Sequence, residues 1–441
     1  MKMDENPPQI KVGDYIIIQR QKYIKLHKFS SLESTAALAN EQLELRNIEG
    51  KLYYSTFKMI VQDKKGGHGG KKRLNSLELC TENEMRNIRE ILNIQECGED
   101  NRNITASGNA QNLKSDDIYK LKDECSGSAE ILEKIVENSK SFASKTEYSQ
   151  EKYLKKKEKK YFEFVQIRQP TIRLLAEIFY RLDPDKVMGI RMDTLSQIIS
   201  YSGICGFGKF LLYESGTNGL LPAAFLNSMG VGTEAQLVHM HPGNICQKQG
   251  ILAMNFPTEL LDRCISVNIY SVLREYFQNA SNSNSSDESN QISEPPFKKQ
   301  KMEKENTENG VTKKSLDVLI EEKTEPQKVP QWHIANQNAC ELIKEKFDSL
   351  IIASKEHPSN ILKTLLPFLK PSRPVVIFNL SKEILAELYV ELKTHSKVTD
   401  LHLTSTWLRY LQILPNRTHP EVNMNANSGY LLHGYTVNTD S

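Results

Sequence analysis

The sequence has no long apolar run, no paired cysteine motif and almost no net charge. No stretch approaches the ~20 apolar residues that a membrane-spanning helix needs, so we expect no such helix. The seven cysteines are scattered and include no Cys-x-x-Cys pair, which predicts reduced thiols in a cytosolic or nuclear compartment and argues against a structural zinc site. Residues 1–9 are polar and contain two prolines, so we expect no secretory signal. The net charge of +2 hides local runs of one sign, which are more informative than the total.

The first 80 residues have the pattern of a small β-domain. At 441 residues the chain is long enough for two or three domains. Apolar and β-branched residues over 14–19 and 23–28 predict a hairpin, and residues 51–62 alternate as a strand does. We therefore predict a small β-barrel over residues 1–80, followed by a charged helical linker over residues 81–160.

Residues 161–278 and 331–441 have the alternating elements of an α/β domain. The predicted strands are 210–213, 235–240, 349–353, 374–379, 401–414 and 430–437. The predicted helices are 171–181, 191–201, 220–229, 332–347, 361–369 and 382–393. Because no helix separates the last two strands, they should close a mostly parallel sheet as an antiparallel hairpin, which is typical of Rossmann-like methyltransferases. The fold class is then α/β plus β. Residues 279–330, rich in Ser, Asn, Glu and Lys, predict a disordered insertion.

The segment after the first strand of this domain has the layout of a cofactor loop without its usual glycines. The strand ends at Glu214, and a tight turn leads to the helix that begins at Leu220. The S-adenosylmethionine (SAM) loop of Rossmann-like methyltransferases has an acidic residue followed by glycine at every second position, which leaves room for the ligand. Here only Gly216 is in register, while Asn218 and Leu220 hold the next two glycine positions. We expect the branched side chain of Leu220 to occupy the ligand's place, so the sequence predicts a degenerate site with no cofactor.

Groups that normally assist SAM are missing as well. The second strand ends at His239-Met240-His241, without a carboxylate for the ribose hydroxyls, and Lys355 follows the fourth strand, where a cation would repel the sulfonium. His239 and His241 could be metal ligands, but with no third ligand nearby we interpret them as strand-end residues and predict no metal. No Ser-His-Asp arrangement, paired-carboxylate motif or phosphate-binding loop is visible, so we predict no catalytic residue. The alternative is that the strands are misplaced and a real site lies elsewhere.

The densest cationic stretch covers residues 152–161. It contains six lysines against one glutamate, with a tyrosine near each end. On a helix these lysines would cover most of the circumference, which suits phosphate contacts that weaken steeply with salt. The tyrosines could stack on unpaired bases. The alternative is a solvated linker, but such a surface usually mixes charges of both signs. We therefore predict RNA binding by this stretch.

Two further polar segments have competing interpretations. Residues 298–301, Lys-Lys-Gln-Lys, follow two prolines in the predicted insertion and are either a nuclear import signal or a run that arose by chance. Residues 414–429 form a long, proline-bounded connection between the last two strands. This connection is either a recognition loop or a plain link between edge strands.

Several short motifs together resemble one family. They are Lys145-Thr146-Glu147-Tyr148-Ser149-Gln150-Glu151-Lys152-Tyr153, Asp193-Thr194-Leu195-Ser196-Gln197, Thr406-Trp407-Leu408-Arg409, Leu414-Pro415-Asn416-Arg417-Thr418-His419-Pro420 and Gly429-Tyr430-Leu431-Leu432. With these motifs the chain resembles the non-catalytic, RNA-binding subunits of eukaryotic tRNA adenine-58 N1-methyltransferases, over nearly its whole length apart from the insertion. The resemblance implies a β-barrel joined to a methyltransferase-like domain that binds no SAM. It also implies a heterotetramer containing two copies each of this chain and a paralogous catalytic subunit that holds SAM.

The resemblance further implies RNA contacts at particular positions. These are Asn101, Arg102, Asn103, Lys152, Tyr153, Lys155, Lys156, Lys157, Lys159, Lys160, Tyr161, Arg181, Lys186, Lys355, His402, Thr404, Thr406, Trp407, Arg409, Arg417, Asn423, Asn425 and Ser428. In the last loop this chain has fewer glycines than the family tends to have.

We therefore predict a nuclear, tRNA-binding, non-catalytic subunit with no membrane association. It would position the tRNA T-loop for 1-methyladenosine formation by its partner. Two alternatives remain open: an active SAM-dependent RNA methyltransferase with an unusual cofactor loop, and a scaffold without RNA contact.

Overall fold

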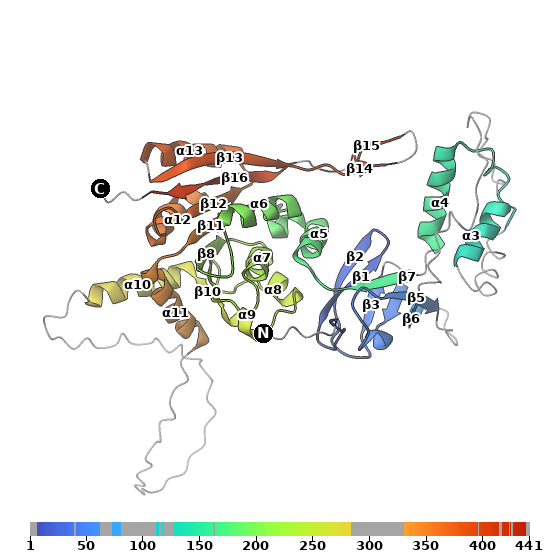
Figure 1. Cartoon of the computed structure of the whole chain (residues 1–441), viewed down its shortest axis with the longest axis horizontal. Coiled ribbons are helices and arrows are strands. Elements are labelled where there is room, and N and C mark those ends of the chain that lie inside the picture. Colours follow the sequence, from blue (N-terminus) through green and yellow to red (C-terminus); the bar gives the residue numbers. More distant parts are fainter. Residues whose placement is uncertain are drawn as a thin grey trace, which may run out of the picture.

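The fold consists of a β-domain, a helical pair and an α/β domain (Figure 1). The computed structural model describes residues 7–38, 41–61, 73–80, 112–113, 117, 128–161, 164–283, 330–395, 397–413, 417–422, 424 and 427–437. Within these residues, no helix is both long and apolar enough to cross a membrane.

The β-domain is one seven-stranded sheet in the order β2-β1-β7-β5-β6-β4-β3. Its strands are β1 (Tyr15–Arg20), β2 (Tyr23–Lys28), β3 (Thr35–Leu38), β4 (Glu41–Glu44), β5 (Thr56–Val61), β6 (Arg73–Leu79) and β7 (Phe164–Arg168), with a short η1 (Arg46–Ile48). The predicted hairpin of β1 and β2 is confirmed, since the two strands pair antiparallel from Tyr15↔Lys28 to Arg20↔Tyr23. The predicted boundary at residue 80 is wrong, because β7 pairs with both β1 and β5 and so belongs to this sheet. Strand pairing over such a distance in sequence leaves no local signal.

Strand β1 is apolar at three consecutive positions because both of its faces are covered. Ile16 and Ile18 are fully buried in the core of the β-domain. Ile17 is fully buried in the core that also contains helix α5 (Ile172–Leu182) of the α/β domain. Asn255 joins the same strand to the α/β domain, since its side chain makes 2.8 Å hydrogen bonds to the backbone N–H and carbonyl of Tyr15. The two domains therefore share a packed interface.

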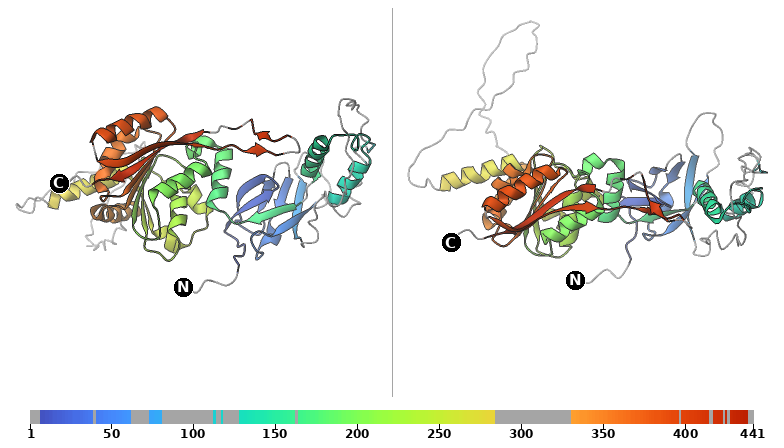
Figure 2. Two further views of the ribbon diagram at one scale, coloured as in Figure 1. Left: turned by 45° about the horizontal axis from the view of Figure 1, so that its top comes forward. Right: turned by 90° about the horizontal axis from the view of Figure 1, so that it is seen from above.

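Two helices form a small unit at one end of the molecule (Figures 1 and 2). They are α3 (Ser128–Glu137) and α4 (Glu147–Tyr161), and α4 contains the lysine-rich stretch. Ile131, Leu132 and Ile135 of α3 form a small buried cluster. Most of the first part of the predicted helical linker, residues 81–127, lies outside the described residues.

The α/β domain is built on a second seven-stranded sheet in the order β10-β9-β8-β11-β12-β16-β13. Its strands are β8 (Lys209–Glu214), β9 (Gln236–His241), β10 (Cys264–Asn268), β11 (Ser349–Ala353), β12 (Pro374–Asn379), β13 (Val398–Trp407) and β16 (Asn427–Thr436). The five strands from β10 to β12 are parallel, and β16 runs antiparallel between β12 and β13. The predicted antiparallel hairpin at the sheet edge is thus confirmed.

Helices cover both faces of this sheet. Alternate residues of β8 explain this arrangement: Phe210 and Leu212 enter the core on one face, while Leu211 and Tyr213 enter the core on the other. The first face carries α5, η3 (Pro184–Val187), α6 (Met192–Ser202), α7 (Leu220–Met229), α8 (Gln249–Ala253) and α9 (Thr258–Asp262). The second carries α10 (Ile269–Ser283), α11 (Gln331–Glu345), α12 (Pro358–Leu365), η4 (Leu366–Phe368) and α13 (Lys382–His395).

Two differences from the predicted elements lie at the end of β13 and at the predicted insertion. The predicted strand 401–414 ends early, because β13 stops at Trp407 and a separate strand pair follows. This pair, β14 (Leu411–Gln412) and β15 (His419–Pro420), is called the arm below. Helix α10 continues to Ser283, five residues into the segment 279–330 that we predicted to be disordered. Residues 284–329 of that segment lie outside the described part of the chain.

Candidate nucleic-acid interface

The arm reaches the lysine-rich helix α4, as both views in Figure 2 show. The guanidinium carbon of Arg417 lies 5.4 Å from the centre of the Tyr148 ring, within the range of a cation–π contact. Arg417 itself is exposed. The structure therefore brings the lysine-rich helix, for which we predicted RNA binding, together with the connection after β13, which we interpreted as either a recognition loop or a plain link.

Tyr153 anchors α4, and two lysines flank its ring. The Tyr153 ring lies 5.6 Å from the Phe142 ring and packs against the α3 cluster. The ammonium groups of Lys145 and Lys157 lie 4.5 and 5.3 Å from the centre of the same ring. Burial lowers the pKa of Lys145. The Tyr153 ring is thus occupied by protein contacts, which corrects the expectation that it stacks on bases. Lys152 and Lys156 are exposed.

Several predicted contact residues lie outside the described part of the chain. These are Asn101, Arg102, Asn103, Asn423 and Asn425, and the side chains of Lys155, Lys159, Lys160 and Tyr161. Their roles stay predictions.

Arg181 has a structural role between the two domains. Its guanidinium donates a hydrogen bond to the carbonyl of Ile24 and lies 5.0 Å from the centre of the Tyr23 ring. The cation predicted to contact RNA thus fixes α5 to β2. Lys186 is exposed and pairs with Asp183 at 3.2 Å. Such an exposed pair opens at little cost, so Lys186 remains available to a phosphate.

The edge strand β13 presents a mixed surface. The exposed His402 lies 2.9 Å from Asp400, and its ring stacks at 5.3 Å on that of His433. Trp407, 72 % exposed, ends the strand, and the exposed Arg409 follows it. Thr404 is half-buried, with its hydroxyl 3.5 Å from a backbone carbonyl of β16. An exposed indole beside an arginine is a surface on which an unpaired base can stack.

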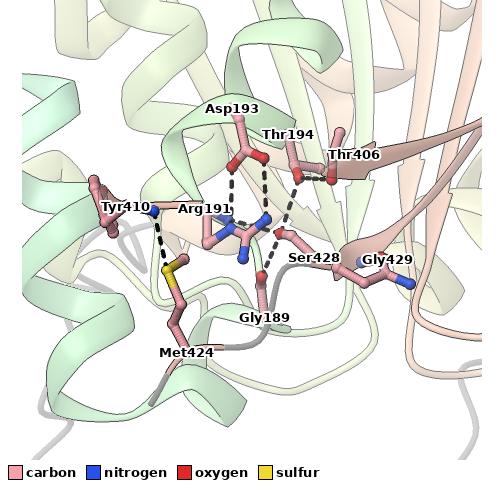
Figure 3. A network of polar contacts seen from close by, with 10 residues as sticks. Gly189, Arg191, Asp193, Thr194, Thr406, Tyr410, Met424, Ser428 and Gly429 are labelled. Atoms are coloured by element: carbon pink, nitrogen blue, oxygen red, sulfur yellow. Dashed lines mark hydrogen bonds and ion pairs between the residues drawn. The ribbon is translucent and has the colours of Figure 1, made fainter. Parts of the chain in front are cut away.

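The hydroxyls of Thr406 and Ser428 lie inside the protein (Figure 3). Thr194 of α6 is fully buried, and its hydroxyl lies 2.8 Å from that of Thr406 and 2.9 Å from that of Ser428. The Ser428 hydroxyl also donates to the Gly189 carbonyl at 2.7 Å and accepts from the backbone N–H of Arg191 at 3.2 Å. The prediction that Thr406 and Ser428 contact RNA is therefore corrected: they fasten β13 and β16 to α6.

This network lies where the chain leaves the sheet for the arm. Arg191 is held by Asp193 through two contacts of 3.1 and 3.2 Å, and the Tyr410 N–H lies 3.2 Å from the sulfur of Met424 (Figure 3). Three of the motifs that marked the family resemblance, those at 193–197, 406–409 and 429–432, meet here. They determine how the base of the arm is anchored.

The loop after β8 carries a buried acid that is already paired. Glu214 is 2 % exposed, accepts a hydrogen bond from Thr217, and lies 3.1 Å from Nε2 of the fully buried His239. The geometry is that of a charge contact rather than of an aligned hydrogen bond. Burial alone would lower the pKa of His239, but its contacts with Cys246 and Glu214 outweigh burial and raise the pKa to about 9. His239, a histidine within β9, thus neutralises the loop's carboxylate.

The same loop is closed by the segment before α8. The Asn218 N–H donates to Oε1 of Gln247 at 2.9 Å, and the Gly250 N–H donates to the Asn218 carbonyl at 2.9 Å. A Cβ on Gly250 would lie 2.4 Å from the carbonyl oxygen of Gly219, which shows how closely the two backbones pack. Leu220 is fully buried in the core at the start of α7. The prediction that the Leu220 side chain occupies the ligand's place is therefore wrong. The chain from Gln247 to Gly250 covers the loop instead.

The remaining residues of this edge do not form a metal site. His239 and His241 lie 5.9 Å apart by ring centres, and burial together with the charge of His239 lowers the pKa of His241. Within the described residues, no group of three or more His, Cys, Asp or Glu side chains could hold a metal ion. Lys355 is exposed, and its N–H donates to the Ser215 hydroxyl at 2.7 Å, so it lies beside the closed loop.

Comparison with known proteins identifies the family. A family model described as the Gcd10p family matches residues 9–308. The chain belongs to the Gcd10p family. A mouse relative, named tRNA (adenine(58)-N(1))-methyltransferase non-catalytic subunit TRM6, is 30% identical over 462 residues, covering 97% of this chain and 88% of its own. A relative of the same name from Dictyostelium discoideum is 30% identical over 439 residues, covering 97% and 79%.

Solved structures similar to the Gcd10p-family chain include the tRNA (m1A58) methyltransferase TrmI from Aquifex aeolicus. It has a TM-score of 0.44 and 10% sequence identity, and the match covers 98% of this chain and 100% of that one. The fold assignment rests on the strand order and register given above.

Two residues that contact the closed loop or its histidine in this Gcd10p-family chain were not predicted from the sequence. Gln247 and Cys246 lie in a polar segment with no motif, and nothing in the sequence shows that the segment folds back onto Glu214 and His239. The one available signal was the pair of histidines in β9, which we interpreted as ordinary strand-end residues. One of them is the counter-ion of the loop's acid.

Proposed function

We propose that this chain is the non-catalytic, tRNA-binding subunit of a tRNA (adenine-58-N1)-methyltransferase complex. The observation that carries this proposal is the closed loop after β8. Its carboxylate is neutralised by His239, and its backbone is hydrogen-bonded to Gln247 and Gly250. A loop in this state offers neither a free acid nor an open backbone to an adenosyl group. The degenerate SAM site is therefore part of the proposal, and methyl transfer belongs to another subunit.

A separate catalytic subunit agrees with the names of the relatives, each of which is called a non-catalytic subunit. We propose that the partner is a paralogous chain that holds SAM, and that two copies of each assemble. Light scattering of the purified complex measures this stoichiometry, and a mass equal to one copy of each chain would contradict it.

The tRNA would be held by the arm, α4 and the exposed end of β13. Arg417, Lys152 and Lys156 supply cations, and phosphate contacts of this kind position an RNA without reading its sequence. The target adenine lies within the folded elbow of tRNA, so extruding it costs a few kcal/mol that contacts to the surrounding RNA offset. This subunit would supply those contacts while the partner supplies the chemistry.

The test of tRNA binding uses the whole complex with Lys152→Ala and Lys156→Ala together. Each lost phosphate contact should reduce the slope of log affinity against log salt by roughly 0.7–0.9, so the pair should reduce it by up to about 2. The matched control is Lys382→Ala with Lys393→Ala, two exposed lysines on α13 at the other end of the molecule (Figure 1). Equal affinities and salt slopes for the two double variants would contradict the assignment and favour a scaffold without RNA contact.

The division of labour is tested separately. Isothermal titration of the isolated chain with SAM should show no binding, and methyl transfer to tRNA should require both subunits. Binding of SAM by the isolated chain, or transfer without the partner, would favour an active methyltransferase with an unusual loop.

Nuclear localisation is also proposed. Substitution of Lys298, Lys299 and Lys301 by Ala in a fluorescent fusion tests whether that run is the import signal.

A further inference from the structure

A thiol, an imidazole and a carboxylate form a chain beside the closed loop. Sγ of Cys246 lies 3.4 Å from Nδ1 of His239, and Nε2 of the same ring lies 3.1 Å from Oε1 of Glu214. The second oxygen of Glu214 accepts a hydrogen bond from Thr217, so the carboxylate is fixed from both sides. This is the order of groups that activates a nucleophile in proteins: the acid orients the ring, and the ring contacts the thiol.

The surroundings favour a thiolate paired with an imidazolium. Burial by itself would raise the pKa of Cys246, but the hydrogen bond and charge of His239 outweigh it and lower the pKa below that of an ordinary thiol. Ser266 adds a hydroxyl 3.4 Å from the same ring nitrogen. The charge of Glu214 acts in the opposite direction and raises the pKa of Cys246, but the contacts with His239 prevail. The thiolate therefore has a cation in contact.

Cys246 also lies where a reagent can reach it. It is half-buried in the segment between β9 and α8, and its neighbour Ile245 is 87 % exposed. Three of the other described thiols have different environments. Burial raises the pKa of Cys264 to about 12 and that of Cys340 to about 11. Cys205 is half-buried, and its thiol donates to the Phe207 carbonyl at 3.2 Å.

We propose that Cys246 is a site of oxidative modification, at which a hydroperoxide converts the thiolate to a sulfenic acid. The sulfur attacks one peroxide oxygen, an S–O bond forms and the O–O bond breaks. The sulfur loses two electrons and the peroxide gains them. The leaving hydroxide, or alkoxide from an organic peroxide, takes a proton from the His239 imidazolium and departs as water or alcohol. Low pKa combined with access is what makes a cysteine selective for this reaction.

The modification would act on the closure of the loop. Cys246 directly precedes Gln247, whose side chain holds the Asn218 N–H. Oxidation adds an oxygen to the sulfur and removes the negative charge that faces His239, so the segment over the loop must shift. We expect faster hydrogen exchange at the Asn218 N–H after oxidation. This inference does not depend on the proposed function.

The experiment uses the complete chain with its natural partner. Hydrogen peroxide is added at substoichiometric to low millimolar concentration, sulfenic acid is trapped with dimedone, and the labelled peptides are quantified by mass spectrometry. A second measurement follows alkylation of each thiol by iodoacetamide from pH 5.5 to 10. Cys246 should be trapped first, and at pH 6.5 it should react at least ten times faster than Cys205, the half-buried thiol without a histidine partner.

Two variants separate the role of His239 from a change in fold. His239→Gln should lower the alkylation rate of Cys246 about tenfold at pH 6.5 while leaving the rate at pH 10 nearly unchanged. The buried thiol of Cys340 should react as slowly as in wild type, because unfolding would expose it. Ser266→Ala touches the same ring nitrogen but leaves the ion pair intact, and should reduce the rate less. A wild-type alkylation midpoint at or above pH 8.5, or dimedone trapping at Cys205 before Cys246, would overturn the proposal without reference to any variant.

Discussion

Gly429, at the base of the arm, lies where any added side chain would be strained and crowded. Its φ of +92° is in the region that favours glycine, and an added Cβ would lie 2.6 Å from Cε2 and 2.8 Å from Cζ of Phe378. Phe378 is fully buried in β12. The Asn379 carbonyl oxygen, at 3.1 Å from the same Cβ, prevents the added methyl group from moving away from the ring. Gly429→Ala therefore combines backbone strain with overpacking.

The size of the effect follows from these two contributions. Holding alanine at a glycine-type backbone conformation costs about 1–3 kcal/mol. Forcing an extra methyl group into a packed core adds about 1–3 kcal/mol. Gly230→Ala is the matched control, because Gly230 has a φ of +74° in the same domain but an added Cβ would meet nothing within 4 Å. Gly429→Ala should therefore lower the free energy of unfolding by about 1–3 kcal/mol more than Gly230→Ala.

Tryptophan fluorescence in a urea titration measures this difference. The chain has two tryptophans, Trp332 in α11 and Trp407 in β13, and both belong to the α/β domain. The signal therefore reports the unfolding of the domain that contains both glycines. If Gly429→Ala were no more destabilising than Gly230→Ala, the packing of β16 against Phe378 would not be as described, and the argument for a rigid arm base would fail.

Three further outcomes follow from the contacts described above. Burial, together with the charge of the imidazole stacked on it, lowers the pKa of His433, so the stability linked to this group is present above pH 6.5 and is lost as the pH falls below it. In urea titrations at pH 7.5 and 5.5, His433→Phe should show a smaller loss on acidification than wild type, and an equal loss would contradict the assignment. Arg417→Ala should weaken tRNA binding several-fold by filter assay, whereas Tyr148→Phe, which keeps the ring that faces the guanidinium, should bind within twofold of wild type. Arg181→Ala should raise protease susceptibility between the β-domain and the α/β domain, while Lys186→Ala, which removes only an exposed ion pair, should not. Equal cleavage of the two variants would refute the proposed role of Arg181 in holding the domains together.

Much of the α/β domain could be predicted from the sequence because its elements carry local patterns. The strands β11 and β12 are continuous apolar runs buried on both faces, and helix α7 begins and ends at the predicted residues. The loss of the glycine pattern after β8 predicted a degenerate cofactor loop with the Leu220 side chain in the ligand's place. In the structure Leu220 packs in the core, and the chain from Gln247 to Gly250 closes the loop.

The predicted RNA contacts also show that the sequence alone does not reveal which polar side chains are buried. The family resemblance implied RNA contacts at Tyr153, Arg181, Thr406 and Ser428, yet their rings, cations and hydroxyls are engaged within the protein. Whether a polar side chain faces solvent or a buried partner depends on what packs against it, and that partner comes from a distant part of the chain.

The sequence by itself determined the order of strands and helices, the cationic character of α4 and the absence of a glycine-rich cofactor loop, because each of these is a property of neighbouring residues. Tertiary structure alone decided that β7 completes the first sheet, that the arm meets α4 at Tyr148, and that His239 joins Glu214 to Cys246. These features depend on strand pairing and burial between distant segments, which the folded core fixes and no local pattern encodes.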